Sequence, residues 1–217
     1  MHNIVLVFLA TALLAVLLSC EHKEVRKGVL TTKTILSCLF VLTAIVQPHP
    51  SPGYYHRLLP GLVLCLGGDV CLALRQKGMF LVGLVFFLWG HVFYIFAFLS
   101  LTQANSWTWI GSPVFLAVSG IVYLRLKPYL GKMQTPVLLY LIVITIMVLG
   151  AWTVLGDSRL TRCGRITVSA GAVSFYCSDV FVARDRFWKR EFFNRLCGLP
   201  LYYAGQFLLA FSAAAHW

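Results

Sequence analysis

Two aspartates stand in stretches of sequence that are otherwise almost entirely apolar. Asp69 lies in the segment 64–72 (LCLGGDVCL) and Asp179 in the segment 175–181 (FYCSDVF). A carboxylate inside a membrane-spanning helix costs on the order of 2.5–3.5 kcal/mol even on insertion scales, so each acid needs a cavity, a polar partner or water. Apolar surroundings also favour the neutral carboxyl, the form that a general acid requires near neutral pH. The two aspartates are therefore the candidate catalytic residues.

Other polar side chains interrupt or border the apolar stretches and are candidates for substrate binding. They are Lys33, Arg75, His91, Tyr94, Tyr203 and Gln206. His91 is expected to orient its neighbours rather than to act as a base. Two aspartates and one histidine on three helices, with no H-x-x-x-H or E-x-x-H pair, do not predict a metal site.

The composition excludes a soluble domain. Of the 217 residues, 59% are apolar and only 12% are charged, against roughly 45–50% and 25% in soluble domains. The mean hydropathy is +0.83. The net charge of +11 would suit a nucleic-acid partner only if the basic residues formed one solvated patch. They are distributed between long apolar stretches instead, which is typical of a membrane protein and predicts no nucleic-acid binding.

Eight stretches approach the length of about 20 residues that a helix needs to cross a bilayer. They are 4–20, 30–46, 58–74, 79–101, 109–126, 136–155, 164–183 and 198–215. The connections are too short for a soluble domain. The prediction is an all-α polytopic membrane protein, with residues 1–217 forming one domain of eight transmembrane helices.

The basic residues orient these helices. Thirteen of the 18 Lys and Arg follow the first, third, fifth and seventh stretches, whereas Arg57, Arg159, Arg162 and Arg165 lie on the opposite side. Because cytoplasmic loops carry the excess of positive charge, both termini are expected outside or in the lumen. The thirteen residues are Lys23, Arg26, Lys27, Arg75, Lys77, Arg125, Lys127, Lys132, Arg184, Arg186, Lys189, Arg190 and Arg195.

The two aspartates are expected at one depth and in related helices. Asp69 precedes Arg75 by six residues and Asp179 precedes Arg184 by five, so both lie roughly 8–9 Å from the cytosolic edge at about 1.5 Å per residue. The segments 69–73 (DVCLA) and 179–183 (DVFVA) also match at an offset of 110 residues. This match suggests a parallel repeat of four helices, in which the two acids approach each other across a pseudo-twofold axis.

Four short motifs in order resemble the lysoplasmalogenase-like (YhhN-type) family of eight-helix membrane proteins. The motifs are GDVCL (68–72), GHVFYI (90–95), SDVFVA (178–183) followed by RF (186–187), and YYAGQ (202–206). One position departs from the family, which tends to have Lys-Pro where this chain has Lys33 and Thr34.

The resemblance implies hydrolysis of the vinyl-ether bond of lysoplasmalogens to a fatty aldehyde and a glycerophospho-ethanolamine or -choline. It implies that Asp69 and Asp179 are the catalytic acids, with a lysophospholipid substrate, membrane lipid around the protein, and no cofactor. The bulky apolar neighbours of Asp179 favour it as the proton donor. Lys33 and Arg75 would attract the phosphate, while Tyr94, Tyr203 and Gln206 would orient the ether oxygen or a water molecule. The active site would face the cytosol, in a bacterial inner membrane or the endoplasmic reticulum.

Two other classes of function fit the same residues. Paired acids in the membrane, a histidine inside a span and a parallel repeat also suit a proton-coupled transporter. A lipid-binding protein without catalytic activity is the third alternative. Aldehyde release by the purified protein separates the three.

Overall fold

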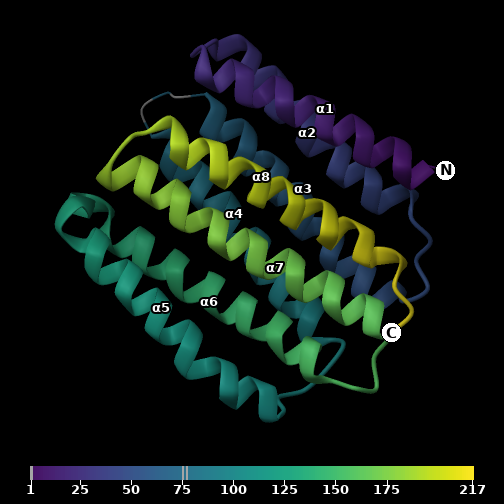
Figure 1. Cartoon of the computed structure of the whole chain (residues 1–217). Coiled ribbons are helices and arrows are strands. Elements are labelled where there is room, and N and C mark those ends of the chain that lie inside the picture. The colour runs from purple at the N-terminus through teal and green to yellow at the C-terminus, as the bar shows by residue number, and fades with distance from the viewer. Residues whose placement is uncertain (1, 75, 77) are drawn as a thin grey trace.

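The computed structural model describes residues 2–74, 76 and 78–217, and in these ranges it is a bundle of eight α-helices without a strand (Figure 1). Short 3₁₀ turns follow α5 (η1, Gly131–Met133) and α8 (η3, Ser212–Ala214), and a π-helical turn follows α7 (η2, Arg184–Trp188). The helices are α1 His2–His22, α2 Arg26–Val46, α3 Pro52–Ala73, α4 Met79–Leu99, α5 Ser106–Leu130, α6 Gln134–Gly156, α7 Arg162–Ala183 and α8 Phe192–Phe211.

Each predicted stretch corresponds to one of these helices. By length and composition, the described chain has seven helical segments that could cross a membrane, and the fifth, Ser106–Gly156, is 51 residues long. This segment contains both α5 and α6, because η1 joins them without a residue outside a helix. The chain reverses at Gly131, whose φ is +50°, and α5 and α6 then pack side by side (Figure 1).

Two helices begin six residues before their predicted stretches, and the first of them is α3, which begins at Pro52 rather than at residue 58. The last helix begins at Phe192 rather than at residue 198. Its first turns contain Asn194 and Arg195, which lower the local hydropathy and hide the start of the helix. Both side chains line a cavity inside the bundle, so their polarity reflects an internal site rather than a loop.

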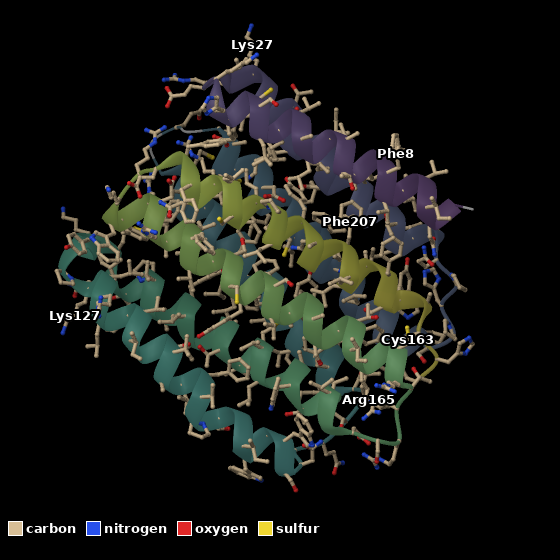
Figure 2. The ribbon with its side chains drawn as sticks, in the orientation of Figure 1. Phe8, Lys27, Lys127, Cys163, Arg165 and Phe207 are labelled. Carbon is tan, nitrogen blue, oxygen red and sulfur yellow. The ribbon has the colours of Figure 1, made fainter. Side chains whose placement is uncertain are left out.

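The basic residues gather at one end of the bundle. The helices α1, α3, α5 and α7 all end at this end, which we call the basic end, whereas both termini lie at the other (Figure 1). Lys27 and Lys127 project from the basic end, and Cys163 and Arg165 lie at the terminal end (Figure 2). Arg75 and Lys77 lie outside the described residues. The basic residues, which are spread along the chain, are therefore concentrated at one of the two ends of the bundle.

The predicted repeat is supported by contacts between equivalent residues. The pairs α3–α4 and α7–α8 make the two most extensive helix contacts. A Cβ atom on Gly90 of α4 would lie 3.1 Å from the Gly61 carbonyl oxygen of α3, and one on Gly205 of α8 would lie 2.8 Å from that of Gly171 on α7. Gly61 and Gly171 are 110 residues apart, and Gly90 and Gly205 are 115 apart. The same glycine crossing thus occurs in both halves.

The outer surface is apolar and the core is aromatic. Phe8 of α1 points away from the bundle and is 73% exposed, while Phe207 of α8 points inward and is 8% exposed (Figure 2). The largest buried side chains include Tyr94, Phe98 and Phe175. Exposed apolar side chains on this scale suit a bundle surrounded by lipid, and the rigid interior positions the polar groups described next.

Candidate active site

Asp69 is held by three side chains from two other helices, α2 and α8. It lies in the last turn of α3 and is 1% exposed. The Lys33 ammonium of α2 lies 3.2 Å from its Oδ1 atom, and the hydroxyls of Ser37 and Tyr202 each donate to Oδ2 at 2.6 Å. A buried carboxylate is stable only with a cation and further donors, and Asp69 has both. The arrangement therefore supports the ionised form of Asp69.

Asp179 has very different surroundings. It lies in the last turn of α7 and accepts a hydrogen bond from the Tyr140 hydroxyl of α6. No Lys, Arg or His of the described chain lies within ion-pair distance of it. Its side chain is partly exposed, and it borders a cavity. The two acids thus occupy equivalent places in the two halves, but within the described ranges only one of them has a cationic partner.

Both aspartates line the same cavity, which has a volume of about 950 Å³. Lys33, Tyr140 and Tyr202 also belong to its wall. Exposed residues such as Arg26 and Arg190 line it toward the basic end, so the cavity opens there. The structure brings together the two predicted catalytic acids and Lys33 in one solvent-accessible space inside the bundle.

Three other predicted binding residues lie behind the cavity wall. Tyr94 donates to the Gln206 amide oxygen at 2.8 Å, and the Gln206 amide nitrogen donates to the Tyr202 hydroxyl at 3.3 Å. Tyr94 and Gln206 are fully buried. Tyr203, also buried, donates to the Lys33 carbonyl oxygen at 3.4 Å. These residues support Tyr202 and α2 rather than face the cavity directly.

His91 is fully buried and is also absent from the cavity wall. Its Nδ1 atom lies 2.6 Å from the Phe87 carbonyl oxygen, as expected for a protonated Nδ1 donating to the preceding turn. Its ring packs edge-to-face on Phe175 and Tyr140, at centroid distances of 4.6 Å and 5.5 Å. The histidine therefore contacts the ring whose hydroxyl binds Asp179, which fits an orienting role. Arg75 lies outside the described residues.

Sequence reasoning missed four residues of the site. Ser37 follows Lys33 by one helical turn and so shares its face, a signal that was available in the spacing. Tyr202 stands beside Tyr203, and adjacent helical residues point about 100° apart, so the sequence did not indicate which of the two reaches Asp69. No pattern in the sequence pointed to Tyr140, because its partner, Asp179, is 39 residues away along the chain. Asn194 was not predicted because the last helical stretch was expected to begin only at residue 198, so that Asn194 fell in a loop.

Together, the fold and the cavity define a polytopic helical membrane protein with a polar, acid-containing site inside its bundle. The chain belongs to the YhhN family, which matches residues 28–213. It is 30% identical over 171 residues to the human lysoplasmalogenase TMEM86A, an alignment that covers 76% of this chain and 67% of the human one.

Other relatives carry similar names. The bovine lysoplasmalogenase TMEM86A is 29% identical over 170 residues, with the same coverage of the two chains. The rat lysoplasmalogenase TMEM86B is 33% identical over 180 residues, covering 81% of this chain and 68% of the rat one. No solved structure matches the chain significantly.

Proposed function

We propose that this protein is a lysoplasmalogenase, which hydrolyses the vinyl-ether bond of a lysoplasmalogen to a fatty aldehyde and a glycerophospho-ethanolamine or -choline. The relatives' names support this activity, and one observation about the site carries it. Two carboxyl groups share a cavity within an apolar bundle, and among the residues that the structure describes only Asp69 has a cation beside it. Paired carboxyls in unlike surroundings divide naturally into an acid and a base.

In the first step, Asp179 acts as the general acid. Its neutral carboxyl donates a proton to the vinyl-ether carbon that bears the hydrocarbon chain, and the electrons of the double bond form the new C–H bond. The other carbon and the ether oxygen then share the positive charge of an oxocarbenium ion. The Tyr140 hydroxyl positions Asp179, and the absence of a nearby cation among the described residues favours the neutral carboxyl.

In the second step, the Asp69 carboxylate stabilises the oxocarbenium ion and accepts a proton from the attacking water. The new C–O bond gives a hemiacetal. This breaks down when Asp69 returns that proton to the ether oxygen, which leaves as the alcohol of the glycerol. The hemiacetal hydroxyl gives its proton to the Asp179 carboxylate as its carbon becomes the aldehyde, so both acids regain their starting states. One water molecule is consumed, as in the hydrolysis of glycosides by paired carboxyls. Lys33, Ser37 and Tyr202 maintain the charge of Asp69.

The six predicted binding residues have different roles in this proposal. Lys33 supports the ionised state of Asp69, and Tyr94 and Gln206 position the Tyr202 hydroxyl. Tyr203 supports the backbone of α2, and His91 supports the Tyr140 ring. The family resemblance suggests Arg75 as a ligand of the phosphate. The basic end faces the cytosol, because positive charge is retained there.

The test is aldehyde release from a lysoplasmalogen by the purified full chain. The wild type should release aldehyde, and Asp69→Asn and Asp179→Asn should each abolish the release, because each removes one of the two proton-transfer groups. Glu24→Gln is the matched control, since Glu24 is an exposed acid of the α1–α2 connection outside the cavity wall. Its activity should equal that of the wild type.

Two results would contradict the proposal. Activity that survives in both aspartate variants would exclude the two-acid mechanism. A folded wild-type protein that releases no aldehyde, but drives solute uptake into proteoliposomes under a proton gradient, would show that the chain is a transporter.

A further inference from the structure

The cavity wall changes its chemistry from one side of the bundle to the other. On the side of α1, α2 and the start of α8 its lining is polar and charged, whereas on the side of α4 and α6 it is mostly apolar and is continued by Phe187 and Trp188 of η2. The polar side is formed by Glu21, Arg26, Lys33, Asn194 and Arg195. The apolar side is formed by Phe80, Leu84, Phe87, Val137 and Phe187. A ligand with one charged end and one hydrocarbon end would have a defined direction in this space.

Arg195 is the most enclosed arginine of the polar side. Its guanidinium donates to the Glu21 carboxylate of α1 at 3.0 Å, and the two side chains are only 16% and 9% exposed. Its Nε atom is buried and has no hydrogen-bond partner in the part of the chain that the structure describes. A buried guanidinium with donors to spare is suited to bind a phosphate, which accepts two parallel N–H bonds.

The other cations of the cavity wall are less suitable. The Lys33 ammonium is already within 3.2 Å of Asp69. The Arg186 guanidinium stacks 4.4 Å from the centre of the Phe80 ring, on the apolar side. Arg26 and Arg190 are exposed, where water screens an ion pair. Arg195 is therefore the cation best placed to bind an anion within the cavity.

We propose that Arg195, oriented by Glu21, binds the phosphodiester of the lysolipid head group, while the hydrocarbon chain lies on the apolar side. This proposal rests on the proposed function, because it assigns a direction to the same substrate. It also explains why the two aspartates have different roles. Asp69 is held by α2 and α8, on the head-group side, and Asp179 is held by Tyr140 of α6, on the chain side.

The direction agrees with the chemistry of the bond. In a vinyl ether, the carbon that takes the proton bears the hydrocarbon chain, and the carbon that takes the water bears the oxygen. With the head group at Arg195, the first carbon faces Asp179 and the second faces Asp69. The reverse direction would place the phosphate beside phenylalanines and the exposed Arg186, whose guanidinium is already stacked on Phe80, and would present the wrong carbon to each acid.

Binding of a saturated analogue tests this site without any catalytic step. The probe is a 1-O-alkyl lysophosphocholine, which has no double bond to hydrolyse, added to the purified full chain in detergent micelles. Arg195→Gln should weaken its binding about tenfold or more, because a charge-assisted hydrogen bond is lost. Arg184→Gln is the matched control. Arg184 also pairs with a glutamate at the basic end, Glu191 at 3.2 Å, but lies outside the cavity wall, so binding should not change.

A second probe separates phosphate recognition from a structural effect. A 1-O-alkylglycerol of equal chain length has no phosphate, so the wild type and Arg195→Gln should bind it equally. Excess inorganic phosphate should displace little of the lysophosphocholine, because free phosphate lacks the chain. If Arg195→Gln binds lysophosphocholine as tightly as the wild type, or weakens both probes equally, the proposal is overturned.

Stability is controlled with a double variant. Glu21→Gln combined with Arg195→Gln removes both charges of the buried pair and so keeps its charge balance, and this double variant should also lose lysophosphocholine binding. Retained binding in the double variant would also overturn the proposal. A failure of the lysoplasmalogenase proposal would look different: the wild type would bind the saturated probe, with its dependence on Arg195, but release no aldehyde.

Discussion

Asp69 and Asp179 have the same side chain and equivalent places in two related helix pairs, yet their contacts differ. Asp69 accepts two hydroxyl hydrogen bonds and lies 3.2 Å from an ammonium, while Asp179 is bound by one tyrosine. A carboxylate with donors and a cation stays ionised, and one in apolar surroundings without a cation favours its proton. In the proposed mechanism, the difference between acid and base is thus produced by neighbours rather than by the aspartates themselves.

The Tyr202 hydroxyl connects Asp69 to the buried Gln206–Tyr94 pair, and its removal should slow the reaction. Tyr202→Phe keeps the ring but removes one donor from Asp69, so we expect kcat to fall about tenfold or more with little change in KM. Steady-state aldehyde release measures both constants. Tyr54→Phe is the control, because it removes a buried hydroxyl that pairs with Ser212 at 2.7 Å, far from the cavity. Equal kcat in the two variants would contradict the role of Tyr202.

Asp157 should stabilise the terminal end of the bundle in a pH-dependent way. It caps α6, accepts from Thr102 at 2.6 Å and pairs with the Arg159 guanidinium. Hydrogen bonds from Arg159 hold the pKa of Asp157 well below its usual range. The ionised carboxylate therefore contributes stability above the unfolded-state pKa of about 4, and this contribution is lost as the pH falls through the lower folded-state pKa.

The measurement compares thermal unfolding of the wild type and Asp157→Asn across pH. At pH 6 the variant should be less stable by about 1 kcal/mol, a small value because Arg159 is largely exposed to water. The difference should shrink progressively below about pH 4. A difference that is constant from pH 6 down to pH 2 would show that the charge of Asp157 is not the cause.

At the scale of elements, glycines set the distance between the paired helices. α7 and α8 approach so closely at Gly205 that an added Cβ would lie 2.8 Å from the Gly171 carbonyl oxygen and 3.0 Å from the Phe175 backbone nitrogen. Both obstacles are backbone atoms and cannot rotate away. The helix pair that carries Asp179 and Tyr202 is therefore positioned by the absence of a side chain.

Gly205→Ala should consequently destabilise the protein by about 1–3 kcal/mol, measured as a lower unfolding temperature in detergent. Gly120→Ala is the control, because a Cβ on Gly120 of α5 meets nothing within 4 Å. Replacing a helical glycine at an open position should be neutral or stabilising by about 0.5–1 kcal/mol. If both variants lose stability equally, helix crossing at Gly205 is not the cause.

At the scale of the whole molecule, the basic end should face the cytosol. Cys163 is exposed at the terminal end and can serve as a reporter when the other six cysteines are replaced by serine. A membrane-impermeant maleimide should label Cys163 in intact cells or sealed vesicles of known orientation from the non-cytosolic side. With Cys163 also replaced, Lys127→Cys should be labelled only after permeabilisation. The opposite pattern would reverse the orientation.

The sequence alone predicted the membrane class, the eight helical stretches, the asymmetry of basic charge and the two aspartates. All of these depend on local composition, because a segment's transfer into lipid and the cost of a charge within it are properties of that segment. The glycine crossings also show that the repeat suggested by a five-residue match continues into the helix contacts.

Only the tertiary structure decided which groups meet. Asp69 binds Tyr202 across 133 residues and Asp179 binds Tyr140 across 39. The start of α8 and the ion pair between Arg195 and Glu21 were likewise visible only in the structure. Each residue rotates a helix face by about 100°, so the partners of a side chain depend on how whole helices are rotated and paired. Hydropathy places a residue at a depth in the membrane, and only packing between helices determines what it faces there.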